Sequence, residues 1–181
     1  MSEANDRALV EKCLAGDTRA FEDLVEGYQK VLYNVALRML NNREDAMDVT
    51  QNAFIKAYER LDTYNPKYKF FSWIYKIMVN ESLNTIRRRK PQTEVHHTIA
   101  SREKTPDESY SENWTMQRVQ SAIIQLPIEY RRLVVLRHFG NLSYRDMSGA
   151  LDIPEKTIKS RLYSARQMLK DILIKRGVVR T

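Results

Sequence analysis

The sequence predicts an all-α protein made of two small helical domains joined by a flexible linker. Apolar residues recur at three- and four-residue spacing along nearly the whole chain, whereas alternating strand-like runs are short and scarce. Gly and Pro number only five each in 181 residues, so long irregular loops are not expected. Between residues 91 and 113 the apolar pattern stops and the chain becomes polar and acidic, as linkers do. We therefore expect domains over residues 1–90 and 114–181.

The first domain is expected to begin with two helices. A short helix over about residues 7–15 is followed by Gly16-Asp17, where Asp17 is placed to cap the next helix. The longer helix carries a one-face apolar stripe from Phe21 to Met39 and ends at Asn41-Asn42.

Two further helices complete the first domain. One extends from Glu44 to Leu61, and the polar loop that follows contains Asn65-Pro66, which disfavours helix. The last helix begins near Phe70 and ends in the basic run 87–90. The core positions expected in the earlier helix are Val49, Ala53, Phe54, Ala57 and Leu61.

The second domain opens with a helix that stops before Pro127. Because proline suits the first position of a helix, Pro127 is expected to start the next one, which continues to the stop signal Gly140-Asn141. Ser143, with Asp146 three residues later, resembles a capping box and predicts a short helix.

Residues 152–154 are too few for anything but a tight turn, and a last helix follows them. That helix buries apolar residues at steps of four and three. Its outward residues are Lys156, Lys159, Ser160, Tyr163, Gln167 and Lys170, with Arg161 and Arg166 on the flanks. Two short helices, a tight turn and a cationic second helix are typical of a helix-turn-helix that reads DNA in the major groove. A helical hairpin with a solvated basic face is the alternative, but it does not explain the scarcity of acids along this helix.

The positive charge is concentrated in the second domain. Residues 114–181 hold 13 Lys and Arg against 5 Asp and Glu, whereas residues 1–90 hold 15 against 13. A compact basic domain is the electrostatic footprint of a polyanion binder. On charge alone, a merely soluble surface explains the imbalance equally well.

Several classes of protein are disfavoured by the composition. The N-terminal residues have no apolar signal segment, and no apolar run approaches the ~20 residues of a membrane span. The single cysteine, Cys13, cannot form an internal disulfide, so we expect a soluble cytoplasmic protein. No Ser/His/Asp set, phosphate-binding glycine loop or paired acids are evident, so we expect neither enzyme activity nor a cofactor. His96 and His97 lack further ligands nearby, and no metal site is expected.

The helix that begins near Phe70 has a polar face with a regular pattern. Lys76, Asn80, Asn84 and Arg88 recur every four residues, opposite the apolar side. A row of amides and cations offers the donors and acceptors that an unstacked base and its phosphates need. This face is a candidate site for single-stranded nucleic acid.

Three ordered blocks of the chain resemble a known family. They read DAMDVTQNAFIKAYERLDTY (45–64), FFSWIYKIMVNESLNTIRRR (70–89) and LPIEYRRLVVLRHFGNLSYRDMSGALDIPEKTIKSRLYSARQML (126–169). Together they are similar to the extracytoplasmic-function (ECF) sigma factors of bacterial RNA polymerase, group IV of the sigma-70 family. The resemblance implies a region 2 domain that binds core polymerase and melts promoter DNA, and a region 4 domain that recognises the upstream promoter element.

In the resembled family, the helix like that from Asp45 to Tyr58 docks on the clamp of the largest polymerase subunits, and the flap region is a further contact. The residues implied for the clamp contact are Asp45, Asp48, Gln51, Asn52 and Lys56. The sequence departs from the family pattern at Met47 and Asn52, where Glu is common, and at Thr50, where an aliphatic residue is usual. The changes at Met47 and Asn52 lower the negative charge of the helix.

The resemblance also implies that the loop 63–69 and the following helix capture a base of the melted non-template strand at the downstream promoter element. The implied residues are Tyr64, Asn65, Tyr68, Lys76, Asn80, Asn84, Arg87 and Arg88. Phe70 and Trp73 are expected to pack beneath the loop, because aromatic residues in a helical stripe usually belong to a core. Contacts to the duplex of the upstream element are expected from Lys156, Thr157, Lys159, Ser160, Arg161, Tyr163 and Arg166.

The implied partners are core RNA polymerase, promoter DNA as duplex and as melted strand, and an anti-sigma factor or another recruiting protein. Two other functions fit parts of the sequence. A stand-alone helix-turn-helix regulator that binds duplex DNA as a dimer accounts for the second domain, and a helical adaptor that binds only protein accounts for the first. Each leaves the other domain without a role.

Overall fold

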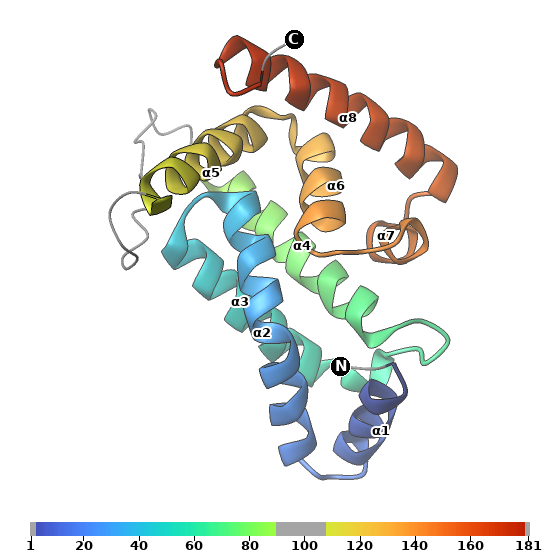
Figure 1. Cartoon of the computed structure of the whole chain (residues 1–181). Helices are drawn as coiled ribbons and strands as arrows, with labels where there is room; N and C mark the ends of the chain where they lie inside the picture. Colours follow the sequence, from blue (N-terminus) through green and yellow to red (C-terminus); the bar gives the residue numbers. More distant parts are fainter. Residues whose placement is uncertain (1–2, 90–107, 180–181) are drawn as a thin grey trace.

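The computed structural model describes residues 3–89 and 108–179, and every regular element in these two ranges is a helix (Figure 1). A single 3-10 turn, η1 (Leu61–Thr63), accompanies the α-helices. The α-helices are α1 (Glu3–Leu14), α2 (Arg19–Leu40), α3 (Arg43–Glu59), α4 (Phe70–Arg88), α5 (Glu108–Gln125), α6 (Ile128–His138), α7 (Tyr144–Leu151) and α8 (Glu155–Lys175). The all-α prediction is confirmed.

The helix boundaries follow the sequence signals at most positions. Asn41 ends α2 in the left-handed conformation, and the side chain of Asn42 accepts a hydrogen bond from the backbone N–H of Asp45 at the start of α3. Most of the expected linker lies outside the described residues. Helix α5, however, begins at Glu108, so its first turns occupy residues that the sequence places in that linker.

Helices α2, α3 and α4 pack together and form the core of the first half. The apolar stripe of α2 is buried as expected, and so are the predicted core positions of α3. Thr50, where the resembled family usually has an aliphatic residue, is also buried; its hydroxyl donates to the carbonyl of Ala46 at 2.7 Å. The departure at position 50 is therefore accommodated inside the helix, because the added hydroxyl has a hydrogen-bond partner.

Helices α7 and α8 form the predicted helix-turn-helix. The Ser143 hydroxyl accepts from the backbone N–H of Asp146, and the Asp146 carboxylate accepts from the backbone N–H of Ser143, which completes the capping box. Asp152 turns the chain in the left-handed region (φ 53°), and α8 begins after Pro154. Burial raises the pKa of the Asp146 carboxyl, but hydrogen bonds from Ser143 and the charge of Lys69 outweigh it and hold that pKa below its usual range.

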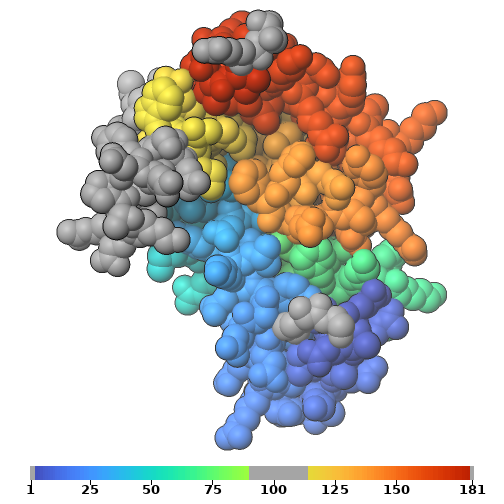
Figure 2. Space-filling view, in the orientation of Figure 1, coloured from blue at the N-terminus to red at the C-terminus, as the bar shows by residue number. Residues whose placement is uncertain are grey.

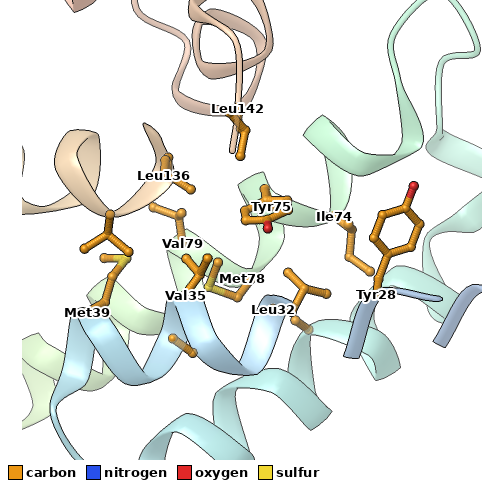
Figure 3. Close-up of a cluster of buried hydrophobic side chains, with 14 of the residues drawn as sticks. Tyr28, Leu32, Val35, Met39, Ile74, Tyr75, Met78, Val79, Leu136 and Leu142 are labelled. Atoms are coloured by element: carbon orange, nitrogen blue, oxygen red, sulfur yellow. The ribbon is translucent and has the colours of Figure 1, made fainter. Parts of the chain in front are cut away.

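The two halves share one continuous core. Helix α2 contacts α5 and α6, and α4 contacts α7. Tyr75 of α4 is fully buried near Leu136 and Leu142 of the second half (Figure 3). In the space-filling view, the second half lies directly on the first (Figure 2). The sequence predicts two domains but contains no signal for this contact, since the apolar residues that form it also serve the core of each half.

The contact between the halves includes specific polar interactions. Arg38 of α2 donates from Nη1 to the side-chain oxygen of Gln120 at 3.0 Å, and Gln120 donates back to the Arg38 carbonyl at 3.2 Å. Arg131 of α6 donates to the carbonyl of Met39 at 3.1 Å. The hydroxyl of Tyr75, by contrast, is buried without a hydrogen-bond partner among the described residues, which costs about 1–3 kcal/mol.

Helix α1 is attached to the first half through a buried polar pair. The hydroxyl of Tyr28 donates to Oδ2 of Asp6 at 2.5 Å, and both side chains are buried. Burial raises the pKa of the Asp6 carboxyl, an effect that the hydrogen bond from Tyr28 opposes. None of the described helices combines the length and the apolar character that a bilayer span requires.

The Asp6–Tyr28 pair predicts a pH-dependent stability. Protonated Asp6 contributes fully to stability at a pH below the ordinary pKa of an aspartate carboxyl. This contribution is lost as the pH rises through the raised pKa that Asp6 has in the folded protein. Tyr28→Phe should lower the free energy of unfolding by about 1–3 kcal/mol at neutral pH, because the buried carboxylate then loses its donor. The difference should narrow on acidification, since the protonated carboxyl depends less on that donor. Urea unfolding across this pH range measures both effects, with Tyr33→Phe as the control because its hydroxyl donates no hydrogen bond within the described part of the chain. Equal losses in the two variants would contradict the prediction.

Candidate functional site

The polar face of α4 presents a row of amides and cations, as the sequence predicts. Asn80 is exposed, and Lys76 and Asn84 are half-buried. Arg87 and Arg88 are exposed at the C-terminal end of the helix, where their charge also suits the helix dipole. Lys76 also takes part in an ion pair that the sequence does not indicate: its Nζ lies 2.6 Å from Oδ2 of Asp152 in the helix-turn-helix.

The loop before α4 is held in shape by its own side chains. The hydroxyl of Tyr64 donates to the carbonyl of Tyr68 at 2.6 Å, and the side-chain oxygen of Asn65 accepts from the backbone N–H of Lys67. The ring of Tyr64 lies 5.7 Å from that of Phe70 and 5.6 Å from that of Trp73. Phe70 is fully buried and Trp73 half-buried, so both pack beneath the loop as expected.

The three candidate residues of the loop, Tyr64, Asn65 and Tyr68, differ in their exposure to solvent. Tyr64 is buried, so the structure places its ring in the core and not on the outer surface where a base could stack. Tyr68 is 60% exposed, and Asn65 is exposed beside it. Of the three, Tyr68 therefore provides the accessible aromatic surface.

The candidate polymerase-binding residues on α3 fall into two groups. Asp48, Gln51 and Asn52 are exposed. Asp45 and Lys56 are half-buried and take part in ion pairs with α4 and its end: Asp45 with Arg89, and Lys56 with Glu81 at 2.7 Å. Asp45 and Lys56 therefore connect α3 to α4, whereas Asp48, Gln51 and Asn52 form the accessible polar surface.

An apolar groove of about 950 Å³ lies between α2 and α3, next to these exposed polar residues. It is lined by the core residues Phe21 and Phe54 and by Met47, Ile55 and Tyr58, which are large apolar side chains left exposed on α3. Our sequence interpretation did not identify this groove. A signal was present, because Met47, Gln51, Ile55 and Tyr58 are spaced as one face of a helix while the buried stripe of α3 occupies another.

The outward face of α8 is cationic and accessible. Six of its seven candidate residues are exposed, namely Lys156, Lys159, Ser160, Arg161, Tyr163 and Arg166, and Thr157 is half-buried. Tyr163 is 66% exposed, which is unusual for an aromatic side chain that serves only a core. Burial, and then the charges of Arg166 and Arg137, lower the pKa of His138 on the neighbouring helix α6, as expected beside a positively charged surface.

The structure does not bring the candidate residues into one site. The faces of α3, α4 and α8 are three separate surfaces, with α7 lying between α4 and α8 (Figure 1). Such an arrangement suits a protein that contacts extended partners at several points. His96 and His97 lie outside the described residues.

Comparison with family models assigns both halves. The model for Sigma-70 region 2 matches residues 24–92, and the model for Sigma-70, region 4 matches residues 116–169. The chain thus has the two-region organisation of Sigma-70 proteins, and the region 4 match includes α8 up to residue 169.

Similar curated proteins identify the family more closely. The chain is 31% identical to the ECF RNA polymerase sigma factor SigW of Bacillus subtilis over 86% of this chain and 89% of that protein. It is 31% identical to the RNA polymerase sigma-H factor of Pseudomonas aeruginosa over 96% of both chains, and 32% identical to the ECF RNA polymerase sigma-E factor of Escherichia coli over 91% of this chain and 92% of that one. This chain belongs to the ECF RNA polymerase sigma factors.

Solved structures agree with the fold. CnrH, in complex with the cytosolic domain of CnrY, aligns with a TM-score of 0.76 and 24% identity over 94% of this chain and 98% of that one. The sigma factor RpoE of Bartonella quintana, in complex with the anti-sigma factor NepR, aligns with a TM-score of 0.71 and 20% identity over 86% of this chain and 98% of that one.

The exposure of Asp48 predicts a loss of polymerase binding on charge reversal. Asp48→Lys should weaken binding to core RNA polymerase by at least about a hundredfold, because it would place a cation where the expected clamp contact takes an acid. Helicity should not change, since Asp48 is exposed and forms no ion pair within the described residues. Titration of labelled chain with core polymerase measures the affinity. Glu11→Lys makes the same reversal on α1, outside the region 2 match, and should bind as the wild type does. Wild-type affinity in Asp48→Lys would contradict this assignment.

Proposed function

We propose that this sigma factor binds core RNA polymerase and directs it to promoters, where region 4 recognises the upstream element and region 2 captures the melted downstream strand. The observation that carries the proposal is the ordered match to both Sigma-70 regions in a chain that exposes a polar face on α3 and a cationic face on α8. Its action is binding and strand capture, and the polymerase supplies the bond chemistry. A partner of RNA polymerase works where transcription takes place, so the proposed location is the cytoplasm.

The contact with polymerase is proposed to combine the polar and the apolar surface of α3. Asp48, Gln51 and Asn52 offer acceptors and one negative charge, and Met47 and Ile55 offer apolar area beside them. Interfaces of this kind gain most of their affinity from buried apolar anchors and gain specificity from the polar rim. The groove therefore supports the clamp contact despite the reduced acidity of this helix.

Strand capture is proposed for the outward face of α4 with Tyr68. Amides at Asn80 and Asn84 can pair with a base edge only after the base leaves the duplex stack, a step that costs a few kcal/mol. Tyr68 provides an exposed ring for stacking, and Arg87 and Arg88 provide cations for phosphates. Capture of this kind stabilises an open promoter and contributes little to duplex binding.

Regulation by a second protein is part of the proposal. The similar sigma factor RpoE of Bartonella quintana is described with an anti-sigma factor. We propose that a partner of this class, or a recruiting protein, controls access of this chain to polymerase. The stand-alone dimeric regulator is not favoured, because it assigns no role to the half that matches region 2.

Asn80→Ala should impair promoter opening more than promoter binding. Run-off transcription with core polymerase should fall by about tenfold on a duplex template, and much less on a template with a pre-opened bubble that removes the cost of unstacking. Asn34→Ala truncates an exposed amide on α2 and should be as active as the wild type on both templates. Equal losses on the two templates would show that Asn80 has a structural role. Absence of run-off activity in the wild-type chain would overturn the proposed function.

Two substitutions on α8 should have different effects. Lys159→Ala should relax sequence preference at one position of the upstream element, at a cost of about 1–3 kcal/mol for the preferred sequence. Arg166→Ala should weaken all sequences alike and lower the slope of log affinity against log salt by about one, as loss of a phosphate contact does. A salt titration of the full chain on a randomised duplex pool, followed by sequencing of the bound fraction, measures both. If the two variants behave identically, α8 is only a cationic surface, and the prediction that it recognises base sequence is wrong.

A further inference from the structure

The first helix, α1, lies outside the region 2 match but contacts the part of region 2 that is proposed to capture the strand. The match begins at residue 24, whereas α1 covers Glu3–Leu14. Helix α1 packs against α2, against α4 and against η1, which leads into the loop of residues 63–69, here called the capture loop (Figure 1). The family match therefore assigns no role to this helix.

A buried polar pair attaches α1 to α2. The Tyr28 hydroxyl donates to Oδ2 of Asp6 at 2.5 Å, and both side chains are buried. Oδ1 of Asp6 is buried too, and it has no hydrogen-bond partner among the described residues. Two apolar side chains would join the helices without leaving such an atom unsatisfied. A hydrogen bond is directional, however, so this pair fixes the position of α1 on α2 more strictly than apolar packing does.

A series of aromatic contacts extends from this pair to the capture loop. The centre of the Tyr28 ring lies 5.8 Å from the ring centres of both Phe70 and Phe71, the first two residues of α4. The Phe70 ring lies 5.7 Å from that of Tyr64, whose hydroxyl donates to the carbonyl of Tyr68 at 2.6 Å. Because close-packed rings cannot move independently, the position of Tyr28 affects the backbone at Tyr68.

Charges on α1 reach the same loop. Burial raises the pKa of the Tyr64 hydroxyl; the charge of Arg7 opposes this effect, and the charges of Asp6 and Glu3 add to it. All three charged residues belong to α1. This helix therefore lies close to the hydroxyl that holds the carbonyl of Tyr68.

The exposed ring of the capture loop thus has a buried support that begins on α1. We propose that Asp6 is a positioning residue for strand capture: through Tyr28 it holds the capture loop in the conformation that presents Tyr68 to the melted strand. This inference rests on the proposed function of α4 and Tyr68. Asp6 is buried, so it acts through its neighbours and does not touch the strand. Helix α1 is then a working part of region 2, although the family match does not include it.

Four variants of the full chain separate the hydrogen bond from stability in general. Asp6→Leu keeps the size of the side chain and removes the acceptor, and Tyr28→Phe removes the donor of the same bond. Asp6→Asn retains an acceptor oxygen and should behave as the wild type does. Val49→Ala is the control for stability, since it truncates a buried side chain of α3 away from this pair. Circular dichroism verifies folding, and if Asp6→Leu does not fold, Tyr28→Phe decides.

The first measurement reports the packing beneath the capture loop. The chain contains two tryptophans, so Trp114→Phe leaves Trp73 as the only fluorophore of this kind. Trp73 is half-buried, and its ring lies 5.6 Å from that of Tyr64. In this background, Asp6→Leu and Tyr28→Phe should each raise the acrylamide quenching constant of Trp73 about twofold, because the loop above it loosens. Asp6→Asn and Val49→Ala should leave the constant unchanged.

The second measurement is run-off transcription with core polymerase and an excess of the chain. On a duplex template, Asp6→Leu and Tyr28→Phe should each lower the yield about fivefold, and on a template with a pre-opened bubble by less than about twofold. The double variant should lose no more than Tyr28→Phe alone, because both substitutions remove one hydrogen bond. A residue that only stabilises the fold would lower the yield equally on both templates.

The inference is overturned by any of three results. These are an unchanged quenching constant in both Asp6→Leu and Tyr28→Phe, equal losses on the two templates, and an effect of Asp6→Asn or Val49→Ala as large as that of Asp6→Leu. Run-off transcription by the wild-type chain distinguishes the two levels. If the wild type is active and one of these results is found, the proposed function stands and only the role of Asp6 is removed.

Discussion

The burial of α4 on two sides is the constraint on which the rest of the structure depends. One side of this helix packs against α2 and α3, and another receives α7 from the second half. Tyr75 and Met78 are fully buried as a result. Burial of an apolar side chain such as that of Met78 contributes roughly 1.5–3 kcal/mol, and several such side chains together fix the rotation of the helix about its axis. Because that rotation is fixed, the polar residues at four-residue spacing emerge together on the face that remains.

The same constraint accounts for the division of charged residues into structural and accessible groups. Asp45 and Lys56 lie where α3 approaches α4, so their charges are used in ion pairs with Arg89 and Glu81. Asp48 lies one turn from Asp45 but is exposed, and it forms no ion pair within the described residues. Isolated ion pairs that are partly exposed are each worth only about 0–1 kcal/mol, so they adjust the orientation of the helices and do not hold the fold together. Apolar burial does that.

Two of the few acidic residues in the basic region 4 lie at its contact with region 2. Residues 114–181 contain only 5 Asp and Glu, and two of them, Asp146 and Asp152, face cations of region 2. The helix-turn-helix is thus acidic toward α4 and cationic on the outer face of α8. A domain with a net positive charge can therefore pack against the cations of α4 and the loop before it, because two of its few acids lie at that contact.

The sequence by itself determined the helices, the buried face of each and the helix-turn-helix, because helical periodicity, caps and turn residues act over a few neighbouring positions. The capping box of Ser143 and Asp146, the turn at Asp152 and the exposed face of α8 were all predictable in this way. Only the tertiary structure decided that Tyr64 belongs to the core, that Asp45 and Lys56 pair with α4, and that Lys76 meets Asp152. Each of these depends on which surfaces meet across long separations in the chain, and an apolar stripe specifies that it must be buried without specifying the partner that buries it.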